Sequence, residues 1–235
     1  VAEKFHVSIS QAGLLVSLFA LVVAISGPTM PLLFSGIDRK KVMLLVLGIF
    51  TAGNIVAIFA SNFIIALLAR VIPAFFHPIY CSLAFSVAAA SVKPEESPKA
   101  VAKVFIGVSA GMVIGVPISN FLAAAASLEM SMAFFALVTA LAWLATFFWI
   151  PAMPVKKKLS YGEQVRVLKN SVTWVSLIAV LLMNGAVFGV FSYLAKYLET
   201  VTHFSWNTIS LLLFVYGMAN ILGSMLAGRL LTKNA

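Results

Sequence analysis

The chain has 235 residues, of which 62% are hydrophobic and 10% charged, and its mean hydropathy is +1.08. This apolar share is well above that of a soluble domain, so the composition excludes the soluble classes and predicts an integral membrane protein. The formal net charge is +9, but the basic residues lie in short connections between apolar stretches, which favours a role in membrane topology over nucleic-acid binding. A single cysteine, Cys81, excludes an intrachain disulfide and a thiol cluster, and we expect neither a metal nor a cofactor.

Seven stretches are apolar and long enough to cross a bilayer as helices, which takes about 20 residues each. Because they are continuously apolar, whereas barrel strands alternate and are shorter, the predicted fold class is an all-α, polytopic helical bundle. The predicted spans are Gln11–Phe34, Val42–Ala60, Phe63–Ala90, Val101–Ala126, Ser131–Ile150, Ser171–Leu194 and Thr208–Leu231. The chain has neither an initiator Met nor a signal peptide at its start and stops just after the last span, so we expect a fragment of a longer protein.

The connections between these spans alternate in charge along the chain. One set holds most of the Lys and Arg residues, whereas the other set holds Lys4 and Lys196. Since cytoplasmic loops carry the Lys/Arg excess, we predict a multi-pass protein of the cell (inner) membrane with Arg39–Lys41, Lys156–Lys169 and the C-terminal end in the cytoplasm. The longest connection, residues 151–170, is the predicted boundary between two bundles.

The stretch from Val104 to Leu122 is apolar but rich in glycine. Gly107, Gly111 and Gly115 recur every four residues, so they share one helix face on which a neighbouring backbone can approach closely. Pro117 then removes a backbone donor. This composition predicts a packing or bending function, and helix packing without any further mechanism is an equally good interpretation.

Arg70 and His77 are the main ionisable groups within the predicted spans. Burying a guanidinium in lipid is costly unless it is paired or meets water, and His77 lies seven residues on, on the same helix face. Pro73 and Pro78 interrupt the hydrogen-bond ladder, so the segment ARVIPAFFHPIY predicts a broken helix that faces a wet cavity. The alternative is that Arg70 extends outward and His77 packs in the protein, which for His77 is at least as well supported.

No Asp or Glu falls inside a predicted span, which leaves His77 as the main candidate for a proton relay unless the carboxylate lies outside this sequence. The last two spans carry further candidate substrate-cavity residues, whose amides alternatively bond between helices: Asn184, Phe188, Tyr216 and Asn220. The motifs of soluble enzymes are missing, among them the phosphate-binding loop, the dinucleotide fingerprint and the zinc-protease and serine-hydrolase signatures. We therefore do not expect an enzyme.

The segment GMVIGVP resembles the antiporter motif on the fifth helix of the twelve-helix drug:proton antiporters of the major facilitator superfamily. The resemblance extends over essentially the whole chain and is closest to the arabinose-efflux-permease-like exporters. It implies that the chain covers the family's second to eighth helices. Residues 1–150 would then hold most of the N-terminal bundle, 151–170 the linker and 171–235 the start of the C-terminal bundle, with the glycine face and Pro117 at the interface between two rocking halves.

The resemblance also implies roles for single residues. Arg70 matches an arginine that the family associates with proton coupling. The family's basic loop motif is matched in degenerate form by Arg39 and Lys40, and its second copy by Gly228 and Arg229. Ser35 and Thr232 occupy the acidic positions of the two copies, which removes the usual loop-to-helix charge latch.

The function expected from these features is proton-coupled efflux of small organic molecules by alternating access. The expected partners are a small-molecule substrate, protons and the lipid bilayer, with no nucleic acid, and we expect the complete protein to be monomeric. A non-transporting receptor or assembly protein with the same fold is the alternative, and a channel is a weaker third because no charge ring or filter sequence occurs. Exporters of drugs, sugars and amino acids share this scaffold, so the sequence does not identify the substrate.

Overall fold

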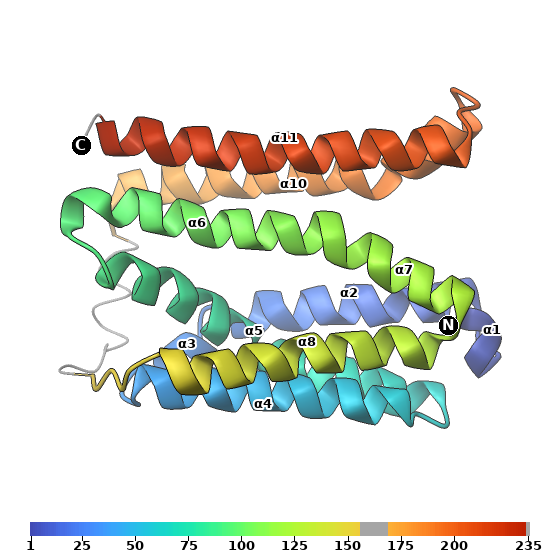
Figure 1. The fold of residues 1–235 in the computed structure, drawn as a ribbon, viewed down its shortest axis with the longest axis horizontal. Coiled ribbons are helices and arrows are strands. Elements are labelled where there is room, and N and C mark those ends of the chain that lie inside the picture. The colour runs from blue at the N-terminus through green and yellow to red at the C-terminus, as the bar shows by residue number, and fades with distance from the viewer. Residues whose placement is uncertain (156–168, 234–235) are drawn as a thin grey trace.

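The computed structural model describes residues 1–155 and 169–233, and every regular element in these ranges is helical (Figure 1). The elements are α1 (Ala2–Phe5), α2 (Ile9–Ser26), α3 (Met30–Leu33), α4 (Arg39–Ile58), α5 (Phe63–Ala90), the 3-10 turn η1 (Pro94–Glu96), α6 (Ser97–Ala110), the π turn η2 (Gly111–Gly115), α7 (Val116–Ala125), α8 (Leu128–Trp149), α10 (Ser171–Thr200) and α11 (Trp206–Lys233). The predicted all-α class is confirmed. Most of the predicted basic linker, residues 156–168, lies outside the described residues.

Five helices in the described ranges are long and apolar enough to cross a membrane: Arg39–Ile58, Phe63–Ala90, Pro94–Ala123, Leu128–Trp149 and Ser171–Phe191. Two shorter apolar stretches, Ser10–Ser26 and Leu211–Ala227, overlap the first and last predicted spans. Each predicted span therefore corresponds to an apolar helix, the first to α2 and the last to α11.

The long helices lie side by side, with their connections at two opposite ends of the bundle (Figure 1). The connection from α2 through α3 to α4, the connection from α5 to α6, the end of α8 and the end of α11 lie at one end. The connections from α4 to α5, from α7 to α8 and from α10 to α11 lie at the opposite end. This arrangement brings together the connections that carry most of the basic residues.

Side-chain caps fix where the long helices begin. The cap residue of each helix accepts a hydrogen bond from a backbone N–H of the first turn, which would otherwise lack a partner. The capping residues are Ser8 for α2, Asp38 for α4, Asn62 for α5, Ser127 for α8 and Asn170 for α10.

The first predicted span, Gln11–Phe34, is wrong at its C-terminal end, because α2 stops at Ser26. Pro28 has no N–H to continue the ladder. The backbone N–H of Thr29 donates to the Ser26 carbonyl over 3.1 Å, and the Thr29 hydroxyl donates to the same oxygen over 3.3 Å, which closes a turn. The chain then forms the short helix α3, which packs against α5.

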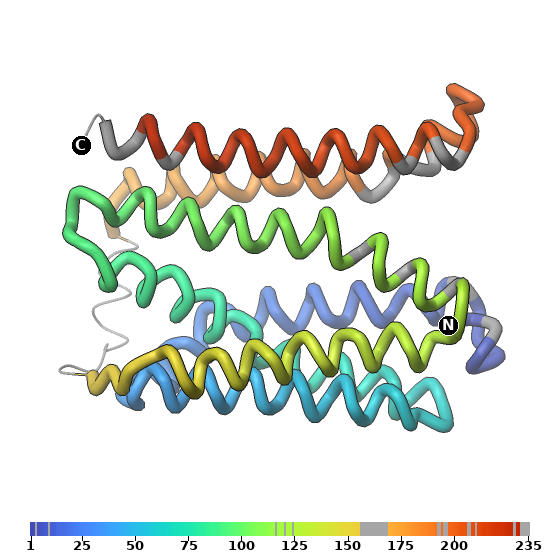
Figure 2. The backbone as a smooth tube through the Cα atoms, viewed as in Figure 1, coloured from blue at the N-terminus to red at the C-terminus, as the bar shows by residue number. Residues whose placement is uncertain are grey.

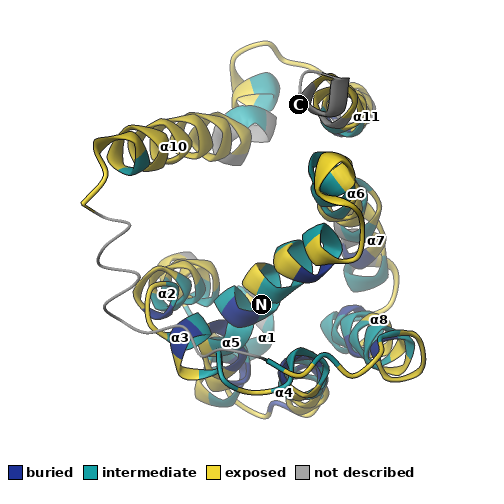
Figure 3. Cartoon of the chain, turned by 90° about the vertical axis from the view of Figure 1, so that its left-hand side faces the viewer, coloured by how far each residue is buried: buried dark blue, intermediate teal, exposed yellow. Residues whose placement is uncertain are grey.

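The described core lies between α4 and α5, where Val42, Val46 and Ile79 are almost fully buried. The helix α4 also packs along α8, and the Thr51 hydroxyl donates to the Thr139 hydroxyl over 3.1 Å between them. Helix α2 packs on α5, whereas α6 lies between α5 and α11. Most described residues of α10 are exposed, as Figure 3 shows.

The predicted glycine-rich span forms one helical rod from Ser97 to Ala125 whose hydrogen-bond pattern changes in the middle. The π turn η2 separates α6 from α7, and the backbone slopes toward α8 beyond it (Figure 2). Of the two functions predicted for this stretch, bending is therefore present in the fold.

Candidate functional site

Helix α5 carries Arg70 and His77 and runs without a break through Pro73 and Pro78, so the predicted broken helix is wrong. Pro73 lacks the N–H that would bond the Ala69 carbonyl, and α4 approaches α5 at this place. A Cβ added at Gly53 would lie 2.7 Å from the Ala69 oxygen and 2.7 Å from Pro73 Cγ. The glycine therefore lets the two helices pack closely over the proline.

Arg70 is partly buried on α5, one residue after this contact. Within residues 1–155 and 169–233 its guanidinium makes neither an ion pair nor a hydrogen bond. A cation within an apolar span is stable only with a counter-charge, with water or with access to the headgroups. Among the described side chains of the membrane helices, the Arg70 guanidinium is thus a charged group that requires a further polar partner.

His77 has packed surroundings instead. Its ring meets Phe19 of α2 edge-on at a centroid distance of 5.7 Å and an interplanar angle of 70°, and it lies 6.0 Å from the ring of Phe50 of α4. Cys81 Sγ is 3.7 Å from each ring nitrogen. These contacts are those of a packing residue, and no contact joins His77 to Arg70.

The three glycines of the predicted interface motif do not make the expected close approach in the described part of the chain. A Cβ added at Gly107, Gly111 or Gly115 would meet nothing within 4 Å. The rod packs against α11, α5 and α8, but none of these helices comes close to the three glycines in the described part of the chain. Pro117 lies in the first turn of α7, where a missing backbone donor costs least.

A close approach occurs at Gly217 of α11, which the sequence analysis did not single out. A Cβ added there would clash with Cγ2 of Val113, the central residue of η2. The available signal in the sequence was a glycine in the middle of the apolar stretch FVYGMAN. The partner is 104 residues away, so spacing within one helix cannot reveal this contact.

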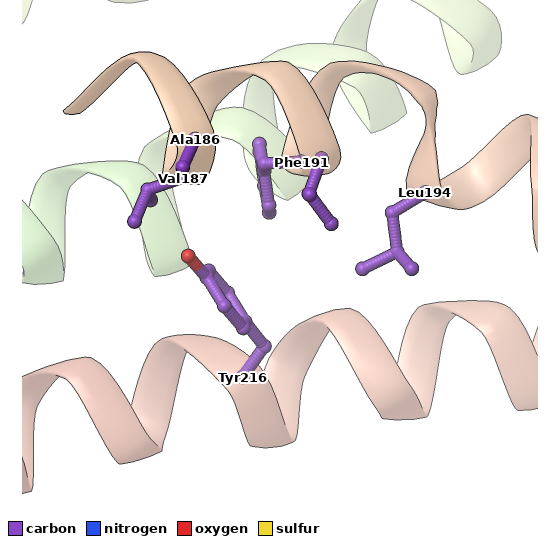
Figure 4. Close-up of a pocket in the computed structure, with 6 residues that line it drawn as sticks. Ala186, Val187, Phe191, Leu194 and Tyr216 are labelled. Carbon is purple, nitrogen blue, oxygen red and sulfur yellow. The ribbon is translucent and has the colours of Figure 1, made fainter. Parts of the chain in front are cut away.

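A pocket of about 310 Å³ lies between α10 and α11 (Figure 4). Its described lining is Ala186, Val187, Val190, Phe191, Leu194 and Tyr216. The rings of Phe191 and Tyr216 stack with centroids 5.2 Å apart and an interplanar angle of 28°. The Tyr216 hydroxyl is the polar side-chain group in this lining, so the pocket suits a flat, largely apolar group.

Of the four predicted cavity residues, Tyr216 alone belongs to this described lining. The Asn184 amide donates to the Val180 carbonyl over 2.8 Å, one turn back on its own helix. Phe188 and Asn220 are exposed, and the Asn220 carbonyl accepts from the Ser224 hydroxyl over 2.9 Å. The described lining of this pocket thus includes Tyr216 and not the other three residues.

The loop-motif residues Arg39 and Lys40 lie against the end of α8. The Arg39 backbone N–H donates to the Met153 carbonyl over 3.3 Å, and Lys40 Nζ lies 5.4 Å from the ring centroid of Phe147. Ser35, at the acidic position, donates its hydroxyl to the Leu32 carbonyl over 2.7 Å. Arg229 lies near the end of α11, and the surroundings of Gly228 are outside the described residues.

Comparison with known proteins decides the family. The model of the Major Facilitator Superfamily matches residues 1–235. The chain belongs to the major facilitator superfamily. This membership confirms the resemblance seen in GMVIGVP, and with the apolar helices it identifies a multi-pass protein of the cell membrane.

Several curated proteins resemble this superfamily chain along its length. It is 32% identical over 235 residues to "Uncharacterized MFS-type transporter YtbD" of Bacillus subtilis (strain 168), covering 100% of this chain and 59% of that protein. It is 26% identical to "Inner membrane transport protein YdhP" of Escherichia coli (strain K12) and 25% identical to "Probable sugar efflux transporter" of Helicobacter pylori (strain G27), in each case covering 100% of this chain and 60% of the relative. The chain therefore spans about three-fifths of the length of these relatives.

Proposed function

We propose that the complete protein is a secondary active transporter that exports small organic molecules in exchange for protons by alternating access. The observation that carries the proposal is the position of Arg70. Its guanidinium is partly buried in a membrane helix and has no polar partner among the described residues, and the chain belongs to the major facilitator superfamily. An intramembrane charge of this kind is costly, and it is stable where a water-filled cavity or a counter-charge reaches it. Such a cavity is also the place where a transporter binds substrate and moves protons.

In this proposal the parts of the chain have separate roles. Residues 1–150 belong to the first bundle, 151–170 to the linker and 171–235 to the second bundle. Arg70 takes part in proton coupling, and the pocket at Tyr216 contributes to the substrate cavity. The glycine motif with Pro117 provides the bend in the rod between the bundles, the basic loop residues hold the cytoplasmic ends, and the protein works as a monomer without enzymatic activity.

Transport by the full-length protein in proteoliposomes tests this function. With an imposed proton gradient, uptake or release of substrate is expected to depend on the gradient and to dissipate it. A screen of drugs and sugars in cells that lack their own efflux pumps supplies the substrate. A substrate flux that is indifferent to the proton gradient would contradict proton coupling.

Arg70→Ala tests the residue on which the proposal rests. We expect this variant to insert and to lose gradient-driven transport by about tenfold or more, because the intramembrane charge is removed. Arg70→Lys keeps the charge and is expected to retain part of the activity. Lys99→Gln removes an exposed charge at the start of α6 and serves as the matched control. An Arg70→Ala variant with full activity would remove Arg70 from the mechanism.

A receptor or assembly protein that keeps the fold without transport is the second candidate function. It is favoured by the degenerate loop motifs, whose acidic positions hold Ser35 and Thr232, and by the lack of an Asp or Glu inside the predicted spans. An acidic residue on a cavity-facing helix in the remainder of the full-length protein would favour transport over this alternative.

A further inference from the structure

Three consecutive cations, Arg39, Lys40 and Lys41, form the first turn of α4. The backbone N–H groups of a helix start already give that end a partial positive charge, so cations are disfavoured there. The carboxylate beside them, Asp38, accepts a hydrogen bond from the backbone N–H of Lys41 over 3.2 Å, and none of the three cations forms an ion pair within the described ranges. The start of α4 therefore carries a positive charge that a bound anion would neutralise.

Lys40 lies against the aromatic end of α8. Its Nζ is 5.4 Å from the ring centroid of Phe147, which is within the range of a cation–π contact. The Phe147 ring stacks on Trp143, one helical turn deeper, with centroids 5.5 Å apart and an interplanar angle of 6°. The indole lies beside α4, because a Cβ added at Gly48 would be 3.8 Å from Trp143 Nε1. Lys40, Phe147 and Trp143 thus form a column along the contact between α4 and α8.

Next to this column, α8 exposes a continuous apolar stripe. Its members recur every three or four residues and so share one helix face, and each is between 44% and 72% exposed: Leu137, Leu141, Leu144 and Phe148. Trp149, which is 81% exposed, ends the helix at the level where tryptophan meets lipid headgroups. Helices α10 and α11 lie on the opposite side of the molecule from α4 and α8 (Figures 1 and 3). These two helices therefore leave the stripe open to lipid.

We propose that the start of α4 and the end of α8 form a binding site for one anionic phospholipid, whose phosphate pairs with Lys40 and whose acyl chains lie along the α8 stripe. An anionic phospholipid matches both parts of the site, because it joins a negative headgroup to apolar chains, and the cytoplasmic leaflet supplies such lipids. A zwitterionic lipid brings a cation of its own, which the positive start of α4 repels. The inference concerns lipid binding and goes beyond the proposed transport function.

Titration of the purified full-length protein in detergent with phosphatidylglycerol tests the site. Native mass spectrometry counts the lipids bound to each protein at each lipid concentration. We expect one phosphatidylglycerol molecule to bind about tenfold or more tightly than phosphatidylcholine with the same acyl chains, because the two lipids differ in net charge. Millimolar inorganic phosphate is expected not to displace this lipid, because free phosphate makes no contact with the apolar stripe.

Lys40→Gln removes the cation at the Phe147 ring and is expected to weaken binding of the tightest phosphatidylglycerol by about fivefold or more. Lys41→Gln is the matched control: it removes the same charge from the adjacent residue, which is exposed, and is expected to change the affinity by less than about twofold. Phe147→Leu keeps the charge and an apolar side chain but removes the ring that holds Lys40. It is expected to weaken binding by about threefold.

Several outcomes would overturn the lipid site. Equal affinities of the wild type for the two lipids would do so, and displacement by inorganic phosphate would show a phosphate site in its place. Equal weakening by Lys40→Gln and Lys41→Gln would show a diffuse attraction to the basic end of the bundle. If Lys40→Gln does not fold, an unchanged affinity in Phe147→Leu would overturn the site. A protein that binds the lipid as expected but moves no substrate would contradict the transport function and leave the lipid site supported.

Discussion

Two ionisable side chains on α5, Arg70 and His77, have different surroundings although they are seven residues apart on one helix. Arg70 has no polar partner in the described part of the chain, whereas His77 is packed by Phe19, Phe50 and Cys81. An aromatic ring held by other aromatic rings contributes packing energy whether or not it titrates. At the residue scale, therefore, we propose coupling for Arg70 and packing for His77.

His77→Phe tests this assignment at residue 77. Because phenylalanine keeps a ring among Phe19 and Phe50, we expect the thermal unfolding midpoint and the pH dependence of transport to stay close to those of the wild type. His77→Ala leaves a space and is expected to lower the free energy of unfolding by about 1–3 kcal/mol. Loss of the pH dependence in His77→Phe would show that the imidazole carries a proton in the cycle.

At the scale of elements, the helices α4 and α5 are fitted to each other at a proline. The Ala69 carbonyl lacks its usual donor because Pro73 stands four residues on, and the Cα of Gly53 faces this carbonyl and the proline ring. A bulkier residue on α4 would push the helices apart. A glycine on α4 thus lets the two helices approach closely at the proline of α5.

Gly53→Ala is expected to destabilise the protein by about 1–3 kcal/mol, because the added methyl group would lie 2.7 Å from a backbone oxygen that cannot rotate away. Thermal unfolding of the purified full-length protein in detergent measures the effect. Gly107→Ala adds the same methyl group where nothing lies within 4 Å, and it is expected to be neutral or slightly stabilising. Equal midpoints for the two variants would show that the approach at Gly53 is not required.

At the scale of the whole molecule, the helices alternate in direction and sort the basic connections to one end. The connection around η1 lies at that end, and the connection from α10 to α11 lies at the other (Figure 1). The Lys/Arg excess assigns the first end to the cytoplasm.

Labelling of single cysteines tests the orientation in intact cells. In a Cys81→Ser background we expect Thr202→Cys to react with a membrane-impermeant maleimide, because Thr202 is exposed in the connection that we place outside. Glu95→Cys, exposed in η1, is expected to react only after the cells are opened. The reverse pattern would invert the predicted topology.

The membrane class, the approximate helices and the charge alternation were predictable from the sequence because they are local properties. The length of an apolar run and the Lys/Arg content of a connection do not depend on distant residues. The first span shows the limit of predicting a helix from its apolar pattern. The segment Gly27–Thr29 contains the signals for a turn and α2 stops at Ser26, but the apolar pattern continues to Phe34. The family resemblance of GMVIGVP was also visible, and the match to residues 1–235 confirms it.

The sequence by itself determined that this chain is a bundle of membrane helices of the major facilitator superfamily with an arginine in one helix. Only the tertiary structure decided that Gly53 and Gly217, rather than Gly107, Gly111 and Gly115, make close approaches within the described chain. It likewise decided that His77 is packed between two phenylalanines and that Tyr216 lines a pocket. The physical reason is that periodicity places a residue on a helix face, whereas the element that packs against that face comes from a distant part of the chain.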